Sequence, residues 1–247
     1  TGAIGSAVNP LATDIANLAA RTSTGGVYVA DVSGLTIASI GGVAGVDAAG
    51  AVVILVAAGN LDTEAGATIA GSSVALAAGA GKIGGAGAVA TRTGMLIAAA
   101  DTGIDIANTN ATLTATLNSN SGMARLTTTG QLFSGGAWSA DTIDLSATGL
   151  ILTHALTSTG ETAIRRSSAG TIGVGDGAGD MVVSGSELQL ITAGSLTIGG
   201  ANTTAVTVDG VTNADTANIA GLVTLDAGEI TFSGAASTFG SLQADAA

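Results

Sequence analysis

The sequence contains no cysteine. Without cysteine the protein forms no disulfide bond, offers no thiolate nucleophile and cannot build a metal site from thiolate ligands. A cysteine-free chain of 247 residues fits a secreted protein that crosses a cell envelope without oxidative trapping.

Aromatic residues are almost as scarce, at 2% of the chain, although 47% of the residues are hydrophobic. The apolar content therefore comes mainly from Ala, Val, Ile and Leu. A wide globular core is normally filled with larger rings. Layers of small branched side chains instead fill a narrow interior, which bulky rings would overpack. The composition favours a narrow, repetitive core.

Positive charge is the third shortage: six Lys and Arg stand against 18 Asp and Glu, for a net charge of −12. Nucleic-acid binding is disfavoured, because neutralising phosphates requires a basic patch. The acidic residues keep a chain rich in apolar residues soluble, and they are compatible with a medium that contains Ca²⁺.

Long hydrophobic runs are missing too. The most apolar stretch, residues 48–61, lies between Asp47 and Asp62 and contains two glycines. It is shorter than the roughly 20 residues that a membrane-spanning helix needs. The sequence therefore predicts no membrane insertion.

What the chain does contain is a series of short apolar couplets, recurring about every eight or nine residues and followed by turn residues. Alternation with period two inside a couplet indicates a strand with one buried face. The couplets are Val27/Val29, Leu35/Ile37, Val52/Ile54/Val56, Val74/Leu76, Leu96/Ile97, Ile104/Ile106, Leu113/Leu117, Ile143/Leu145, Leu150/Leu152, Ile172/Val174, Val182/Val183, Leu188/Leu190, Leu196/Ile198, Val206/Val208, Val223/Leu225 and Ile230/Phe232.

Short strands joined by corners predict an all-β solenoid that winds around one axis. Three strands per coil give about 24 residues, hence about ten coils over ~48 Å. Paired glycines, such as those at 41–42 and 199–200, suit corners that require positive φ. Residues 9–18 could also form a helix, with Pro10 at its first position, but the neighbouring period-two segments favour strands.

Several segments resemble repeats of large bacterial exoproteins of the filamentous haemagglutinin type. Residues 4–20 (IGSAVNPLATDIANLAA), 24–29 (TGGVYV) and 34–37 (GLTI) resemble one unit of that family. Residues 50–59, 73–79, 194–199 and 222–228 are similar to its GxVxLxAxG strands. The resemblance implies a right-handed parallel β-helix, secretion to the cell surface, and a role in adhesion or surface fibres. The family's amino-terminal secretion domain is not recognisable in this chain.

Candidate reactive residues are few. His154 is the single histidine, and the strand-like segment around it favours a surface or stacked side chain over a ligand. No G-x-S-x-G, H-E-x-x-H or Walker motif occurs. Residues 175–183 resemble a Ca²⁺-binding glycine/aspartate nonapeptide, but Ala178 replaces a required glycine and the motif occurs once. Arg165 and Arg166 form the only adjacent basic pair.

Two functions other than a structural one stay open. Many polysaccharide lyases and hydrolases are β-helices, and they need paired acids with aromatic or basic residues that grip the sugar. The candidates for such roles, or for a shared Ca²⁺, are Asp62/Glu64, Asp101/Asp105 and Asp141/Asp144, with Tyr28, Phe133 and Trp138 as sugar platforms. An ice-binding solenoid would use Thr-x-Thr rows, which occur at Thr112/Thr114/Thr116 and Thr127/Thr129 but do not recur with a fixed period.

The sequence thus predicts a single solenoid over residues 1–247, with no catalytic, cofactor-binding or metal-binding residue. The repeating pattern is under way by Ile4 and continues to Leu242, so we expect a segment of a longer shaft or one unit of a fibre. The predicted function is that of a secreted, structural or adhesive protein of the bacterial surface. Its predicted partners are other copies, by end-to-end or lateral association, and host or cell-surface glycans.

Overall fold

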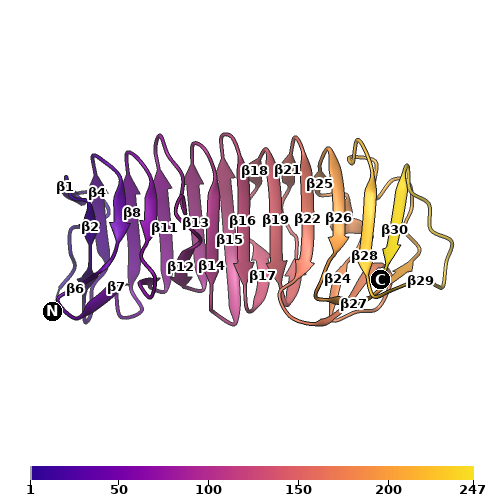
Figure 1. The fold of residues 1–247 in the computed structure, drawn as a ribbon, viewed down its shortest axis with the longest axis horizontal. Coiled ribbons are helices and arrows are strands. Elements are labelled where there is room, and N and C mark those ends of the chain that lie inside the picture. The colour runs from indigo at the N-terminus through magenta and orange to yellow at the C-terminus, as the bar shows by residue number, and fades with distance from the viewer. Residues whose placement is uncertain (1) are drawn as a thin grey trace. The chain divides into compact units, whose positions relative to one another are not determined.

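A computed structural model describes residues 2–247, and nearly all of its regular elements are β-strands. Its contacts divide into two units, of which the first ends at Leu126 and the second begins at Thr127. Each unit is a right-handed parallel β-helix (Figure 1), and the two contain about ten coils between them. This confirms the predicted fold class. Whether residues 1–247 form one continuous body stays a prediction.

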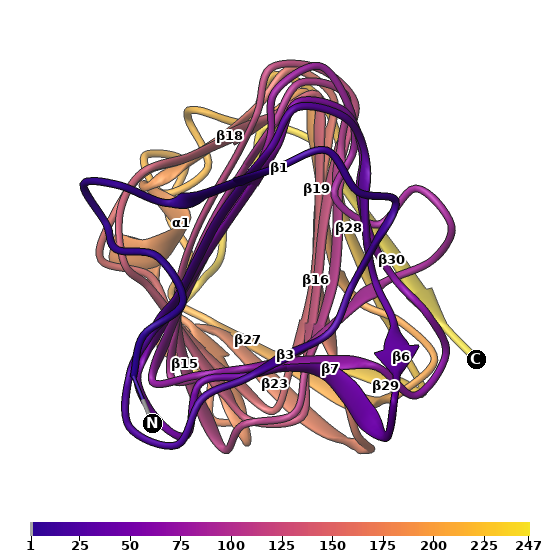
Figure 2. The same cartoon turned by 90° about the vertical axis from the view of Figure 1, so that its left-hand side faces the viewer.

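Three parallel sheets make up the first unit, and Figure 2 looks along the direction in which its coils are stacked. The first sheet contains β1 (Leu11–Thr13), β4 (Val27–Asp31), β8 (Val52–Ala57), β11 (Ser73–Ala78), β13 (Met95–Ala100) and β15 (Thr112–Ser119). The second contains β3 (Ala20–Arg21), β7 (Val43–Asp47), β10 (Thr68–Ala70), β12 (Val89–Arg92) and β14 (Ile104–Asn108). The third contains β2 (Asn17–Leu18), β5 (Leu35–Ile37) and β9 (Leu61–Thr63). In addition, β6 (Ser39–Ile40) pairs antiparallel with β7.

The second unit has the same construction. Its longest series of hydrogen-bonded parallel strands contains β19 (Thr142–Ala147), β22 (Glu161–Arg166), β26 (Ser195–Gly199), β28 (Val223–Ala227) and β30 (Leu242–Ala246). A second contains β18 (Trp138–Ala140), β21 (Leu156–Ser158) and β25 (Ile191–Thr192), and β17 (Gln131–Ser134) pairs with β20 (Gly149–Ile151). A third contains β24 (Met181–Val183), β23 (Gly170–Gly175), β27 (Thr203–Asp209) and β29 (Glu229–Phe232). The remaining strand, β16 (Met123–Thr128), contains the division between the units.

The register of the first sheet gives the length of each coil. Val27 pairs with Val53, Val53 with Val74, Val74 with Leu96 and Leu96 with Ala115, so successive coils take 26, 21, 22 and 19 residues. The predicted coil of about 24 residues is close to these values. In the second unit the pairings of β19, β22, β26, β28 and β30 give 19, 34, 27 and 19 residues. Coil length varies because loops of different length are inserted at the corners.

The interior is filled by columns of aliphatic side chains. One column runs through Val29, Leu55, Leu76, Ala98 and Leu117, and none of these residues is more than 2% exposed. Burying a Val or Leu side chain contributes roughly 1.5–3 kcal/mol. Small branched residues fill this narrow space from coil to coil, which is why the chain needs so few aromatic residues.

Two of the predicted strands are corrected by the structure. The couplet Val52/Ile54/Val56 faces outward, and Val53 and Leu55 between them are fully buried. Alternation cannot identify the buried face of a strand that is apolar on both sides. The couplet Leu188/Leu190 is not a strand, because Leu188 ends the helix α1 (Gly185–Leu188).

That helix has a local cause. Ser184 accepts a hydrogen bond from the Glu187 backbone N–H, and the Glu187 side chain accepts one from the Ser184 N–H, which forms a capping box. The Ser-x-x-Glu spacing is visible in the sequence. In contrast, residues 11–13 and 17–18 are strands, which confirms the preference for strands over a helix there.

The first and last coils leave inward positions uncovered. Leu11 pairs with buried Val29 but is 47% exposed, and Leu242 pairs with Val223 but is 36% exposed. Among the described residues, these two side chains point into a column that continues on one side only. End-to-end association of copies stays a prediction.

Candidate functional site

His154 lies at an exposed corner between β20 and β21, not within a strand as predicted from its neighbours. Its ring Nδ1 is 3.0 Å from Thr153 Oγ1 and 3.2 Å from the Ser134 carbonyl oxygen. Its backbone N–H donates to Ser134 Oγ at 3.1 Å. These contacts hold a corner together, and the Ser134 hydroxyl is occupied in accepting backbone donors.

The glycine/aspartate loop of residues 175–180 packs against its own strand. A Cβ on Gly173 would lie 1.9 Å from the Gly177 carbonyl oxygen, so glycine is required for this close approach of two backbones. Asp180 Oδ2 accepts hydrogen bonds from the Thr171 N–H at 2.9 Å and the Thr171 hydroxyl at 3.2 Å. These donors, joined by the charge of Arg166, lower the pKa of Asp180. The glycines are explained by close packing of the loop.

The acidic pairs that were candidates for catalysis or a shared cation bind different parts of the structure. Asp62 Oδ1 accepts from the Ala86 N–H at 3.0 Å, whereas Glu64 Oε2 accepts from the Ser39 N–H at 3.2 Å. The first bond reaches the following coil and the second reaches the preceding one.

The other two pairs are divided in the same way. Asp101 accepts from Asn120 Nδ2 at 3.2 Å, and Asp105 lies 4.0 Å from the Arg125 guanidinium. Asp144 forms an ion pair with Arg165 at 3.2 Å, and the Asp141 carbonyl accepts from the Gly160 N–H at 2.7 Å. Among residues 2–247, no three His, Asp or Glu side chains gather in a group that could hold a metal ion.

The aromatic candidates do not form a sugar platform. Trp138 is 1% exposed and pairs in register with Leu156, so its indole ring belongs to the core of the second unit. Phe133 is half-buried on β17, and Tyr28 is half-buried on the outer face of β4 in the first unit.

The threonine row at Thr112, Thr114 and Thr116 does face outward from β15, as predicted. Its neighbour in register on β13 is not a second threonine row, because Thr114 pairs with Met95 and Thr116 with Ile97. Thr127 and Thr129 of the second predicted row are exposed, and Thr128 between them is buried. The first unit therefore does not repeat the Thr-x-Thr spacing from coil to coil on this face.

Sequence reasoning missed Asp31, which is 4% exposed at the end of β4. Its carboxylate accepts hydrogen bonds from Thr13 Oγ1 at 2.7 Å, the Ile15 N–H at 3.0 Å, and the N–H and hydroxyl of Ser33 at 2.9 and 2.7 Å. Burial raises the pKa of Asp31, but these donors together outweigh burial and lower it to about 2. The Asp-x-Ser spacing of an Asx turn was the available signal.

Asp215 has the same role in the second unit. Its carboxylate accepts from the Thr212 N–H at 2.7 Å, from Gln189 Nε2 at 2.8 Å and from the Thr212 hydroxyl at 2.8 Å. The Thr212 N–H contributes most to a lowered pKa of Asp215, followed by Gln189. The residue joins the turn after β27 to the segment that follows α1.

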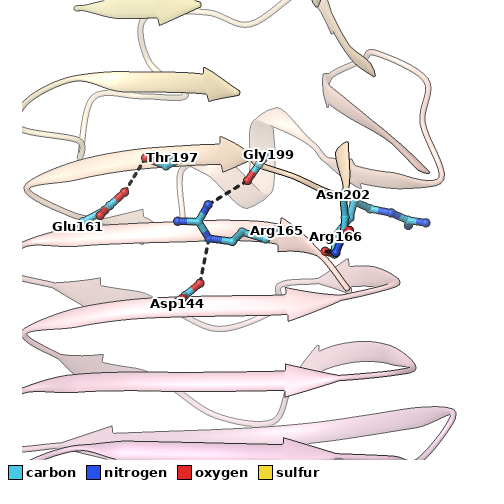
Figure 3. A network of polar contacts seen from close by, with 7 residues as sticks. All are labelled: Asp144, Glu161, Arg165, Arg166, Thr197, Gly199 and Asn202. Carbon is cyan, nitrogen blue, oxygen red and sulfur yellow. Dashed lines mark hydrogen bonds and ion pairs between the residues drawn. The ribbon is translucent and has the colours of Figure 1, made fainter. Parts of the chain in front are cut away.

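The outer face formed by β19, β22 and β26 is polar. Figure 3 shows Arg165 between Asp144 on one neighbouring strand and the Gly199 carbonyl on the other, with the Glu161–Thr197 contact nearby. Arg166, the other half of the basic pair, is 7% exposed, and its guanidinium donates to the Thr148 carbonyl. Its own carbonyl accepts from Asn202 Nδ2 at 3.2 Å. The basic pair therefore ties coils together.

The outer face of β8, β11 and β13 in the first unit is aliphatic except for Ser73. We call it the aliphatic strip, and it consists of Val52, Ile54 and Val56 on β8, Ser73, Ala75 and Ala77 on β11, and Met95, Ile97 and Ala99 on β13. Val56, Met95 and Ile97 are 40%, 48% and 48% exposed. A trough of about 170 Å³ runs over Ala75 and Ala77 of β11, with Ile54 and Val56 of β8 on one side and Ile97 and Ala99 of β13 on the other.

A polar depression of about 460 Å³ lies at another corner of the first unit. It forms where the small residues Ala70 and Gly71 lie between Asp47 and Arg92, which are register neighbours of Ala70 on either side. Asp47 Oδ1 accepts from the Ala49 N–H at 2.9 Å, so this carboxylate also stabilises a turn.

Within residues 2–247 no helix is long and apolar enough to cross a bilayer. No protein-family model, curated protein or solved structure matches this chain. The solenoid fold that the resemblance implied is present, and membership of the filamentous haemagglutinin type stays a prediction.

Proposed function

We propose that this protein is a structural and adhesive component of a bacterial surface or an extracellular fibre, in which the β-solenoid serves as a shaft. One observation carries the proposal: polar side chains that could have formed a reactive site are used to join successive coils. Asp31 and Asp62 accept hydrogen bonds from backbone N–H groups of a neighbouring coil, and Asp215 accepts one from the Gln189 side chain, 26 residues earlier.

A shaft needs this distribution of bonds, because each coil contacts only its neighbours and every junction must resist opening. The filled aliphatic columns supply the main stabilisation, and the acidic corner residues fix the position of one coil on the next. The acid-rich, cysteine-free composition is compatible with an extracellular medium.

The proposal is tested on cells of the source organism. Antibody against residues 2–247 should label surface fibres in electron microscopy, and deletion of the gene should reduce adhesion to host cells or glycan-coated surfaces. Complementation with the wild-type gene should restore both. Labelling confined to the cytoplasm, or unchanged adhesion after deletion, would contradict the proposed role.

The enzyme alternative has its own readout. Purified protein should release no new reducing or unsaturated ends from acidic polysaccharides. Cleavage that disappears in Asp62→Asn but persists when the exposed carboxylate of Asp176 is replaced in Asp176→Asn would favour a carbohydrate-active enzyme instead.

A further inference from the structure

The aliphatic strip combines a raised strand and a recessed strand of matching length. Residues Val52, Ile54 and Val56 form a ridge on β8, and they pair in register with Ser73, Ala75 and Ala77 on β11. Every large outward side chain of the ridge therefore has a small neighbour at the same height along the strand. The trough over β11 is bounded on its other side by Ile97 and Ala99 of β13.

We infer that the aliphatic strip is a docking surface for a second copy of this chain. Consider a copy turned by half a revolution about an axis that is parallel to the strands and lies between β8 and β11. Its β8 ridge comes to lie over the first copy's β11 trough, and the reverse contact forms at the same time. Rotation about this axis does not change the position of a residue along the strand direction. Ile54 of one copy therefore lies over Ala75 of the other, and Val56 lies over Ala77.

Such a contact is isologous, since the same patch is used on both copies, and it closes as a dimer. The fit arises because ridge and trough are adjacent strands of one sheet. A partner of unrelated sequence would have to supply both shapes at the strand spacing of ~4.8 Å, whereas a second copy supplies them by construction.

Charge also favours this face, over others of the molecule, as the place where two copies meet. The chain carries a net charge of −12, so most relative orientations of two copies are repulsive. The outward residues of β4, β8, β11, β13 and β15 include no Asp, Glu, Lys or Arg. The strip and its borders are therefore a surface on which two copies can meet without burying an unpaired charge.

The area limits the strength of the contact. Five strands spaced ~4.8 Å apart, each with six residues at a rise of ~3.3 Å per residue, give a face of about 480 Å² per copy. Stable interfaces bury about 800 Å² per partner, so the dimer is a weak one that forms at high local concentration. Neighbouring shafts at a cell surface would be at such a high local concentration. The inference itself depends on β8, β11 and β13 and not on the proposed adhesive role.

Sedimentation equilibrium of purified protein over about 10–1,000 µM should show a monomer–dimer equilibrium. Ile97→Lys places a charge on the strip and reduces the net negative charge, so general electrostatics alone would strengthen association. We expect it instead to raise the dimer Kd by at least about tenfold. The matched control Thr157→Lys makes the same charge change at an exposed outward position of β21 in the second unit, and it should leave the dimer intact.

Ala75→Leu tests whether the dimer depends on shape complementarity or only on the amount of apolar surface. It fills the trough while adding apolar surface, so it should weaken the predicted dimer and strengthen non-specific aggregation. Both strip substitutions point outward from the sheet, and circular dichroism should show that they fold like the wild type.

Cross-linking reports the geometry directly, because the chain has no native cysteine. A mixture of Val56→Cys and Ala77→Cys proteins should be joined by a short bis-maleimide faster than Ala77→Cys protein alone, since two troughs do not face each other. A monomer at every concentration, a dimer that survives Ile97→Lys, or a discrete dimer of Ala75→Leu with a lower Kd than that of the wild type would each overturn the inference. A monomer that binds phosphatidylcholine vesicles through the strip would also overturn it, in favour of a lipid.

Discussion

At the scale of single residues, Asp31 shows how a corner is held. Four donors from three residues converge on one buried carboxylate, and two of those residues, Thr13 and Ile15, belong to the preceding coil. Hydrogen bonds to a charged group contribute about 1.5–3 kcal/mol each, more than bonds between neutral groups. The charged form of Asp31 is therefore part of the fold.

The lowered pKa of Asp31 predicts a loss of stability in acid. Because the pKa is about 2 in the folded state and 3.8 in its ordinary state, the stabilisation is complete above about pH 4 and is lost as the pH falls towards 2. Urea unfolding followed between pH 7 and pH 2 should show this loss, on the order of 1–2 kcal/mol. Asp31→Asn should be destabilised at pH 7 and should lack this part of the pH dependence.

Removing one hydrogen-bond donor to the Asp31 carboxylate provides a control for this prediction. Thr13→Val removes one of the hydrogen bonds but keeps the carboxylate, so the acid-dependent loss should become smaller without disappearing. An Asp31→Asn protein with the wild-type pH profile would contradict the assignment of this loss to Asp31.

At the scale of secondary-structure elements, close stacking of strands decides where glycine is needed. Gly45 on β7 has φ +87°, and a Cβ there would lie 2.2 Å from the Thr68 carbonyl oxygen of the next coil. Gly50 has almost the same φ, +83°, but a Cβ there would meet nothing within 4 Å. The two positions share a positive φ, which would strain any residue with a Cβ, and differ in contact with a neighbouring strand.

Alanine substitutions at these two glycines should therefore differ in their cost. Gly50→Ala introduces only the left-handed conformation, at about 1–2 kcal/mol. Gly45→Ala adds an overlap with β10, so its cost should exceed that of Gly50→Ala by at least about 1–3 kcal/mol. Urea midpoints of the two variants measure the difference. Equal costs would show that β7 can move away from β10 without loss.

At the scale of the whole molecule, composition and charge decide behaviour in solution. The chain carries 18 acidic residues, and several of their carboxylates are held by backbone donors at corners. Cations in the medium therefore act on the protein mainly by screening its excess negative charge. A built Ca²⁺ site would need several oxygen ligands in one place.

Metal removal should accordingly have little effect. We expect EDTA to leave the thermal midpoint unchanged, and Ca²⁺ and Mg²⁺ at equal concentration to raise it equally, because screening does not distinguish the two ions. Differential scanning calorimetry measures these shifts. A larger rise with Ca²⁺ than with Mg²⁺, abolished in Asp180→Asn, would instead assign a calcium site to the loop of residues 175–180.

Some features of the fold could be read from individual residues. The couplets at Val27/Val29 and Leu196/Ile198 alternate with other residue types, so the buried face was evident. The scarcity of aromatic side chains indicated a narrow interior. At residues 52–56 the same reasoning failed, because both faces are apolar and period two gives no preference. At Ser184 and Glu187 the capping spacing was present, but the surrounding couplets favoured a strand.

By itself, the sequence determined the class of fold: period-two couplets punctuated by turn residues, in a chain poor in aromatic residues, have few other ways to bury their side chains. Only the tertiary structure decided which coils meet. Pairing of β11 with β8 and β13 depends on coil lengths, which vary from 19 to 26 residues in this sheet, and this variation sets which side chains become neighbours. The acidic corners and the aliphatic strip are products of that register, since their members lie about one coil apart in the sequence.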